Sequence, residues 1–377
     1  MGRFGRLPTV LVYCAMDYGY YRDALAGIAK YAGRKWRILI TTDFPSANHL
    51  KGHHAVGFIG PITSPEREDI VRNAGIPGVN ISSHLKTPRT AAVRPNNPVI
   101  GEIAADHLID RGYRHFAVTD TSDKGYENDR VRGFVDRLAA QGYACTVLPR
   151  HLSEQGDDPR DPKALAALVK PVGIFMPHDR AAIRMLSKVV DANFNVPGDF
   201  AFVGVDNDVA FCTATLPNLT SIDPGSDIVG FKAAQVLDEM LANKRQPRAP
   251  ILIAPRGVIA RESTDLAKLN DPEIAGIVRY IREHACQGLA VKAVSEQFAM
   301  SRRTLERRFN QLLGRSVLDE IRRVQIEHAR ELLTQTDLKI ETVSSRCGFE
   351  DFRCLIRQFR KHEGVPPGTF RRMRRMK

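Results

Sequence analysis

Two stretches in the C-terminal third of the chain place arginines on one side of a helix and apolar residues on the other. One runs SRRTLERRFN from Ser301 and the other DFRCLIRQFR from Asp351, and each contains a Leu and a Phe four residues apart. Residues four apart share a helix face, so the arginines point away from the buried side. Because arginine can donate two hydrogen bonds to guanine O6 and N7, the pattern indicates two helices that contact DNA bases.

The first stretch is expected to contact bases through an outward stripe at helical spacing. Ser301 can cap the helix, and Glu306 can accept a hydrogen bond from a cytosine amino group. Arg302 and Arg308 are better placed to contact phosphates, which position a protein without specifying sequence. The residues expected to face bases are Arg303, Glu306, Arg307 and Asn310.

In the second stretch, Arg353 and Arg357 share one face, and Phe352 beside them can touch a thymine methyl group. Arg360 is expected to contact phosphate. A single helix of this kind could equally be an ordinary solvated face. Two of them, about fifty residues apart and joined by a helix that can hold them roughly one DNA turn apart, favour DNA binding.

The positive charge of the chain is concentrated at the same end. The 377 residues carry a formal net charge of +12, and from residue 272 onward there are 22 Lys and Arg against 13 Asp and Glu. The other residues therefore contribute only about +3, which makes the C-terminal part the polyanion-binding one.

The C-terminal part is predicted to be all helical. Asp271-Pro272 supplies an N-cap followed by proline at the first helical position, so we place a domain boundary there. The next helix carries Ile274, Ile277 and Ile281 on one stripe. Further helices are expected at 292–298, 301–313, 317–333, 340–347 and 351–361.

Residues 271–372 resemble the DNA-binding domain of the AraC family. The resemblance rests on the segments 293–298, 301–309, 329–333, 348–349, 359–361 and 364–371. It implies two helix-turn-helix units joined by one long helix. The positions that match base-facing residues of the family are Arg303, Glu306, Arg307, Phe352, Arg353 and Arg357. Cys354-Leu355 stands where the family usually has Tyr-Phe, a difference expected to affect packing more than function.

The first 256 residues alternate short apolar runs with amphipathic stretches, as in a parallel sheet covered by helices. Strands are expected at 9–14, 36–41, 55–59, 78–80, 115–119, 173–176 and 200–205. Helices are expected at 21–32, 99–111, 129–141, 181–192 and 228–242. Their number favours two α/β lobes.

Polar side chains follow several of these strands. In open α/β sheets, ligands bind beyond the carboxyl ends of the strands, so we expect Asp120, Ser122, Asp179 and Asp206 to converge on one crevice, with Arg130 from the following helix. A sugar fits such a set, because its hydroxyls can donate to a carboxylate and accept from a guanidinium. The alternative is that each residue caps a helix or closes a turn, above all Asp179.

The same half resembles the LacI/GalR regulators and the type I periplasmic sugar-binding proteins. The resemblance rests on the segments 106–115, 130–134, 195–199, 203–207 and 219–223, and it implies that Arg130 and Asp206 bind sugar hydroxyls. The chain opens on the first strand without the N-terminal headpiece of that family, so DNA binding is expected at the other end.

The sequence therefore predicts a two-lobed α/β sensor of the periplasmic-binding-protein type (residues 1–256), a linker (257–270) and an all-α AraC-type domain with two helix-turn-helix motifs (271–377). The expected function is to control transcription, with activation favoured, by sequence-specific DNA binding. A small sugar is expected to regulate this binding. The expected partners are promoter DNA, a second copy of the chain and, for an activator, RNA polymerase.

Other classes of protein fit less well. A DNA-repair methyltransferase would need a metal-bound cysteine nucleophile, but the six cysteines show no CxxC pairing, and GxSxG, HExxH and Walker sequences are absent. We therefore expect reduced thiols, no metal, no cofactor and no enzyme activity. A secreted solute-binding protein would carry a signal peptide, and a membrane protein an apolar run of roughly 18 residues. Neither is present, so we expect a cytoplasmic protein.

Overall fold

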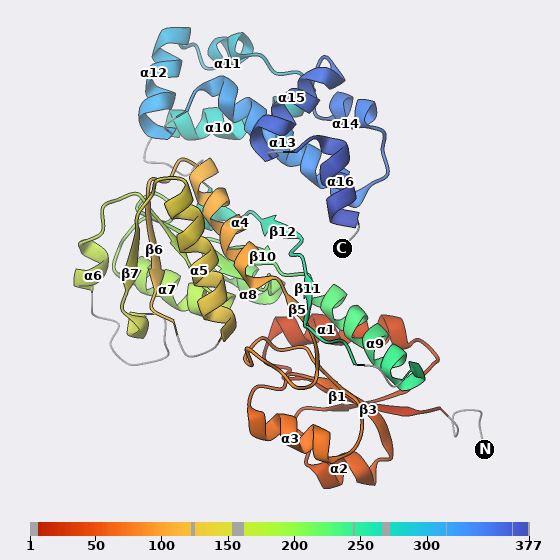
Figure 1. The fold of residues 1–377 in the computed structure, drawn as a ribbon. Helices are drawn as coiled ribbons and strands as arrows, with labels where there is room; N and C mark the ends of the chain where they lie inside the picture. Colours follow the sequence, from red (N-terminus) through yellow and green to blue (C-terminus); the bar gives the residue numbers. More distant parts are fainter. Residues whose placement is uncertain are drawn as a thin grey trace.

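The computed structural model describes residues 7–121, 125–152, 162–243, 246–265, 272–313, 315–363 and 365–375. It contains two α/β lobes and a helical domain that lies against the second lobe (Figure 1). The fold class predicted from the sequence is confirmed.

The first lobe is a six-stranded parallel sheet in the order β11-β5-β4-β3-β1-β2. Its strands are β1 (Thr9–Tyr13), β2 (Arg37–Thr41), β3 (Ala55–Gly60), β4 (Gly78–Asn80), β5 (Ala91–Pro95) and β11 (Ile251–Ile253), and its helices are α1 (Gly19–Ala32), α2 (Ala47–Gly52), α3 (Pro65–Asn73) and α9 (Ser226–Asn243). Helices α1 and α9 pack with their backbones in close contact. A Cβ on Gly230 would lie 1.8 Å from the Ala24 carbonyl oxygen, so only glycine permits this packing.

The second lobe repeats the arrangement in the order β12-β10-β9-β8-β6-β7. Its strands are β6 (His115–Thr119), β7 (Cys145–Leu148), β8 (Val172–Phe175), β9 (Phe200–Val205), β10 (Thr220–Asp223) and β12 (Gly257–Ile259). Its helices are α4 (Asn97–Asp110), α5 (Gly125–Ala140), α6 (Pro162–Ala166), α7 (Asp179–Asp191) and α8 (Val209–Ala214). Strand β9 is buried at all six positions, which is why its apolar run was predicted with the same bounds.

The chain crosses between the lobes at three adjacent places. The crossings lie between β5 and α4, between β10 and α9, and between β11 and β12. Hydrogen bonds join them, from the Asn96 amide to the Ile253 carbonyl (2.7 Å) and from the Arg256 amide to the Asp223 carbonyl (2.9 Å). The lobes are therefore connected by three short segments that are hydrogen-bonded to one another.

The segment expected to be a linker begins as part of the second lobe. Strand β12 pairs antiparallel with β10, and the 3-10 turn η2 (Glu262–Thr264) is anchored because the Ser263 hydroxyl donates to the Phe202 carbonyl (2.7 Å). This corrects the sequence interpretation for residues 257–264, whose Gly-Val-Ile strand is too short to give a periodic signal. Residues 266–271 lie outside the described part of the chain.

The helical domain contains α10 (Pro272–His284), α11 (Val291–Gln297), α12 (Arg302–Leu313), α13 (Val317–Gln335), α14 (Ile340–Arg346), α15 (Phe352–Glu363) and α16 (Pro367–Arg375). The long helix α13 joins two similar units, α11–α12 and α14–α15. It begins with a capping box in which Ser316 and Asp319 bond each other's backbone amides. Helix α16 was not predicted from the sequence.

The first helical unit and the second lobe share one apolar core. A single cluster of buried side chains includes Leu108 and Tyr113 of the lobe together with Leu313 and Ile321 of the helical domain. The second unit has a separate cluster around Leu355 and Phe359. The helical domain is therefore packed against the second lobe through its first half.

Candidate functional site

A cavity of about 200 Å³ lies between the two lobes. The first lobe contributes Tyr13, Tyr18, Tyr20 and Tyr21 to its wall, and the second lobe contributes Tyr126. Aromatic rings present an apolar face and, in tyrosine, a hydroxyl at the edge, so this wall can contact both carbon and oxygen atoms of a small polar molecule.

Arg130 and Asp206 line the same cavity, as the sequence predicted for a pair in one crevice. Arg130 lies in the second turn of α5, and its Nη1 is 3.5 Å from Asp206 Oδ1. Its guanidinium is held from behind, since Nε donates to Asn97 Oδ1 (2.9 Å) and Nη1 to the Pro177 carbonyl (2.6 Å). The arginine is therefore fixed in position before any ligand is bound.

Asp206 follows β9 in an unusual backbone conformation. Its φ is +108° and that of Asn207 is +48°, a region that residues with a side chain rarely occupy. Burial raises the pKa of Asp206 to about 6, although the neighbouring Arg130 acts to lower it. A strained turn that carries a carboxyl with a raised pKa is typical of a functional position.

The other predicted effector residues lie elsewhere. Asp179 is buried beneath the site, where it accepts hydrogen bonds from Ser221 Oγ (2.6 Å) and the Asp208 amide (2.9 Å) and does not line the cavity. Asp120 is exposed at the end of β6, and its Oδ1 accepts from the Thr121 amide. The two residues therefore close turns, which was the alternative considered for them. Ser122 lies outside the described residues.

The sequence analysis missed the first-lobe wall of the cavity. The run Ile81–His84 follows strand β4, and Ser82 Oγ lies 2.6 Å from His84 Nδ1. The His84 ring packs edge-on against Tyr126 of the other lobe at 5.2 Å. The argument from strand ends could have found this run, but it carries no carboxylate or arginine and therefore did not attract attention.

Direct contacts hold the lobes together around the cavity. Arg22 of α1 forms an ion pair with Asp208 of the second lobe at 2.7 Å. Arg180 donates to the Asp17 carbonyl (2.9 Å), and its guanidinium lies 4.7 Å from the centre of the Tyr18 ring. The lobes are thus closed on each other in this structure.

The two arginine-rich helices have the same pattern of exposure. In α12 and α15 the Leu and Phe pairs, Leu305 with Phe309 and Leu355 with Phe359, are fully buried. The predicted contact residues Arg302, Arg303, Arg307, Asn310, Phe352, Arg353, Arg357 and Arg360 are exposed. Ser301 Oγ accepts from the Thr304 amide (3.1 Å), which confirms its position as the cap of α12.

Two of the residues assigned to DNA contact other helices of the protein. Glu306 Oε2 accepts from the Val317 amide (3.2 Å) and so links α12 to α13. Arg308 Nη1 forms an ion pair with Glu273 of α10 at 2.6 Å. Both partners lie in other helices, so the sequence pattern of α12 alone could not reveal them.

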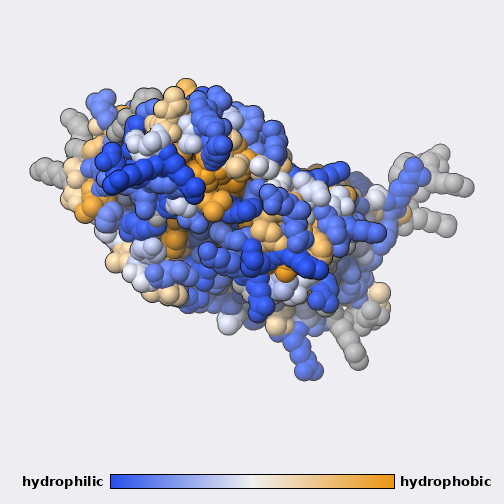
Figure 2. Space-filling model, turned by 90° about the horizontal axis from the view of Figure 1, so that it is seen from above, coloured by the Kyte–Doolittle hydropathy of each residue, from blue (hydrophilic) through white to orange (hydrophobic). Residues whose placement is uncertain are grey.

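The outer face of the helical domain, seen from above in Figure 2, is hydrophilic over most of its area, with small apolar patches between polar side chains. All six cysteines carry free thiols. Within the described part of the chain, His, Cys, Asp and Glu residues form no group that could hold a metal ion. No described helix has the length and hydropathy needed to cross a membrane.

Two family models match the chain. Residues 105–264 match a periplasmic binding protein-like domain, and residues 294–373 match a helix-turn-helix domain. The chain is a transcriptional regulator in which a periplasmic-binding-protein-like sensor precedes an AraC-type helix-turn-helix domain.

The chain is similar to xylose operon regulators over nearly all of its length. The xylose operon regulatory protein of Escherichia coli K12 is 28% identical over 367 residues, which cover 93% of this chain and 94% of that protein. The Haemophilus influenzae protein of the same name is 25% identical, covering 93% and 95%. A solved xylose-binding transcription activator, XylR, superposes with a TM-score of 0.61 at 26% identity, covering 98% of this chain and 99% of that one.

Proposed function

We propose that this chain controls transcription by binding promoter DNA through its two helix-turn-helix units, under the control of a small sugar bound between the lobes. The pair formed by Arg130 and Asp206 supports the sugar most directly. The guanidinium can donate to a hydroxyl oxygen while the carboxylate accepts from the neighbouring hydroxyl, an arrangement that suits vicinal hydroxyls. The tyrosines can pack against the apolar faces of the sugar ring.

The effector that we infer is D-xylose or a closely related monosaccharide. The relatives named above are xylose operon regulators, and a cavity of about 200 Å³ has the volume of roughly seven water molecules, which suits one small molecule. Arg130 and Asp206, which line the cavity together, can offset each other's charge, so a neutral ligand fits better than an anion or a cation. A different sugar or a non-sugar effector is the alternative.

We further propose that the exposed arginines of α12 and α15 contact bases in successive major grooves. Arg303 and Arg307 of α12, and Arg353 and Arg357 of α15, would face bases, while Arg302 and Arg360 would bind phosphates. We expect the regulator to act as a homodimer in the cytoplasm and, as an activator, to contact RNA polymerase. Glu306 and Arg308 would instead hold α12 against its neighbours.

In this mechanism the sugar stabilises the closed arrangement of the lobes. It can shift the equilibrium only as far as its affinity for the closed arrangement exceeds that for the open one. Asp206 and Arg130 both belong to the second lobe, so contacts with the first lobe must supply this difference. Tyr21 and the run Ile81–His84 are placed to make them.

Calorimetric titration of the full-length protein with pentoses and hexoses tests the sugar assignment. We expect D-xylose or a stereochemically close monosaccharide to bind, and Asp206→Ala to abolish the heat of binding. Gel retardation with promoter DNA, repeated at two salt concentrations, tests the second half of the proposal, since phosphate contacts make affinity salt-dependent. Absence of binding to any monosaccharide would overturn the effector, and absence of retardation would overturn the regulator.

A further inference from the structure

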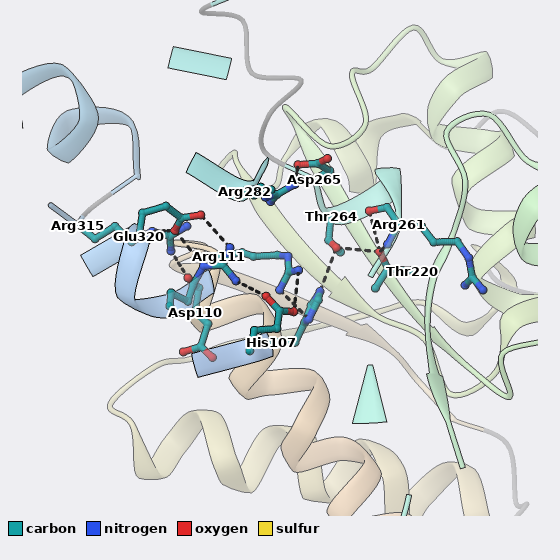
Figure 3. Close-up of polar contacts among 12 residues, drawn as sticks. His107, Asp110, Arg111, Thr220, Arg261, Thr264, Asp265, Arg282, Arg315 and Glu320 are labelled. Carbon is teal, nitrogen blue, oxygen red and sulfur yellow. Dashed lines mark hydrogen bonds and ion pairs between the residues drawn. The ribbon is translucent and has the colours of Figure 1, made fainter. Parts of the chain in front are cut away.

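A line of polar contacts leads from the turn beside the cavity to the second lobe's last segment. Figure 3 shows the part of it that runs from Arg261 through Thr220 and Thr264 to His107 and Arg111. It begins at Asn207, the neighbour of Asp206, whose Oδ1 accepts from Arg261 Nη2 (2.6 Å). The Arg261 amide donates to Thr220 Oγ1 (2.8 Å), and that hydroxyl lies 2.8 Å from Thr264 Oγ1. The segment that follows β12 is thus bound to the effector turn through side chains.

From Thr264 the line continues into the helical domain. His107 Nε2 of α4 lies 3.0 Å from Thr264 Oγ1, and His107 Nδ1 accepts from Arg111 Nη1 (2.8 Å). Arg111 Nη2 then lies 3.8 Å from Glu327 Oε1 of α13. The residues concerned come from one end of α4 and the middle of α13, where the two domains meet.

Hydrogen-bond chemistry assigns a single direction to these contacts. Arg111 can only donate, so His107 Nδ1 must be the acceptor, and a neutral ring then carries its proton on Nε2. That N–H donates to Thr264, whose hydroxyl must in turn donate to Thr220. Thr220 can then donate to the Arg261 carbonyl, from which it lies 3.1 Å. The His107 ring N–H and the hydroxyls of Thr264 and Thr220 all find acceptors in this one arrangement, whereas the buried Arg111 Nε has no hydrogen-bond partner.

The middle of the line is closed to water, whereas Asn207 and Arg261 at its start are partly exposed. Thr220 and Thr264 are 0% exposed, His107 6% and Arg111 5%. Burial and the charge of Arg111 hold the pKa of His107 well below its usual range, which keeps the ring neutral. A buried polar group that loses its partner cannot turn to solvent, so these residues hold or change their arrangement together.

At its far end the line reaches a group of charged side chains in the first half and middle of α13. Glu327 Oε2 also pairs with Arg323 (2.8 Å), and Arg323 makes two hydrogen bonds to Glu320, which is fully buried. Arg315 pairs with Glu320 at 2.8 Å and donates to the Asp110 carbonyl at the end of α4. Because α13 joins both helix-turn-helix units, its orientation on the second lobe sets the position of α12 and α15.

We propose that Asn207, Arg261, Thr264, His107 and Arg111 are positioning residues that couple the effector turn to helix α13. This inference rests on the proposed function, since it needs a ligand that contacts Asp206. In this proposal the turn at Asp206 and Asn207 is the element that changes its arrangement, since positive φ angles at residues with a side chain persist only where surrounding contacts hold them. A ligand that moves this turn shifts the Arg261 side chain, and the fixed donor order transmits the change to Arg111 and α13.

The test measures coupling separately from binding. Fluorescence anisotropy gives the Kd of the full-length protein for a DNA fragment selected by the wild-type protein from random sequences, with and without saturating D-xylose. The ratio of the two values is the coupling factor, commonly about 5 to 150 in allosteric proteins. We expect Thr264→Val to bring the factor to within about twofold of 1, and Thr264→Ser, which retains the hydroxyl, to restore it. D-xylose affinity of the free protein should change much less.

Ser263→Ala is the matched control. Ser263 lies in the same turn, is equally buried and makes two hydrogen bonds, to the Phe202 carbonyl and from the Thr220 amide, but it lies outside the line. It should lower the melting temperature as Thr264→Val does and keep the coupling factor. His107→Leu combined with Thr264→Val should lose no more coupling than either change alone.

The outcomes separate the two proposals. A wild-type protein that responds to D-xylose while Thr264→Val responds equally well would overturn the coupling line and leave the proposed function intact. Equal loss of coupling in Ser263→Ala would also overturn it, because any damage to the turn would then suffice. If none of the monosaccharides altered the DNA affinity of the wild-type protein, the proposed function would be refuted. The coupling line would then lose the ligand on which it depends.

Discussion

Arg22 of the first lobe and Asp208 of the second form an ion pair of 2.7 Å that joins the lobes directly. Asp208 is nearly buried and also packs against α1, where a Cβ on Gly19 would lie 2.7 Å from its Oδ2. The pair can form only when the lobes are closed, so it stabilises the closed arrangement and not the open one.

Arg22→Gln is therefore expected to raise the Kd for the sugar. An ion pair whose arginine is 34% exposed contributes roughly 0.5 to 1 kcal/mol, which corresponds to a Kd about two- to fivefold higher. Isothermal titration calorimetry measures the change. Arg132→Gln is the control, because it removes a pair of 2.9 Å with Asp129 within a single helix and should leave the Kd unaltered. Equal effects of the two variants would contradict a role in closure.

The pKa of Asp206 predicts that sugar binding weakens in mild acid. Burial raises this pKa to about 6, and the ionised carboxylate accepts a stronger hydrogen bond from a sugar hydroxyl and forms the ion pair with Arg130, which the protonated carboxyl does not. The Kd should rise about tenfold as the pH falls from 7 to 5. In Asp206→Asn the binding should be weaker and nearly independent of pH over this interval. A variant that keeps the wild-type pH profile would assign the titration to another group.

The same carboxyl has the opposite effect on folding. Since its folded-state pKa lies above the ordinary value, the folded protein binds more protons than the unfolded chain between about pH 4 and 6. Its contribution to stability is thus present at low pH and is lost as the pH rises through 6. Urea unfolding should show Asp206→Asn gaining roughly 1 kcal/mol over the wild type between pH 5 and pH 7. No relative change would mean that the carboxyl titrates in its ordinary range.

Arg303 and Arg302, neighbours at the start of α12, should differ in what they contribute to DNA binding. Arg303→Ala is expected to weaken the free energy of binding to the preferred sequence by about 1 to 3 kcal/mol and to relax the preference at one base position. Arg302→Ala should weaken binding to all sequences alike. It should also reduce the slope of the logarithm of the binding constant against the logarithm of the salt concentration by about 1. Anisotropy titrations on the preferred and a mismatched fragment, at two salt concentrations, distinguish the two. The same phenotype for both would refute the assignment of Arg303 to a base.

The sequence predicted the elements with a clear apolar pattern. Strand β9 is an uninterrupted apolar run, and helix α12 has Leu305 and Phe309 at helical spacing between exposed arginines. Asp206 was predicted from its place directly after such a strand. Strand β10 (Thr220–Asp223) was missed because its Thr, Ser and Asp side chains are polar, although three of its four residues are buried. Edge strand β7 was missed because two of its four residues face solvent.

Partners from distant segments could not be predicted in the same way. The bond from the Val317 amide to Glu306 depends on how α13 returns past α12, and the buried position of Asp179 depends on how β9 and β10 enclose it. A side chain's local pattern indicates which way it points but not what it meets. Ser82 and His84 could have been noticed because they follow strand β4, but their position opposite Tyr126 of the other lobe became visible only in three dimensions.

Gly112 and Leu313 give a direct test of how the helical domain is seated on the second lobe. Gly112 follows α4 with a φ of +89°, and a Cβ there would lie 2.6 Å from the Leu313 carbonyl oxygen. Gly112→Ala should therefore separate the domains locally as well as strain the turn. Gly142→Ala is the matched control, since Gly142 has a φ of +80° and a Cβ there would meet nothing within 4 Å.

Both alanine variants should lose about 1 to 2 kcal/mol from the left-handed backbone, and Gly112→Ala roughly 1 to 3 kcal/mol more from overpacking. Hydrogen exchange should show faster exchange at Tyr113 and in the first turn of α13 for Gly112→Ala only. Because the coupling line crosses the same interface at Arg111 and Glu327, this variant should also weaken the response of DNA binding to the sugar. If the two variants were equally stable and equally protected from exchange, the domains would not be packed at Gly112 in solution.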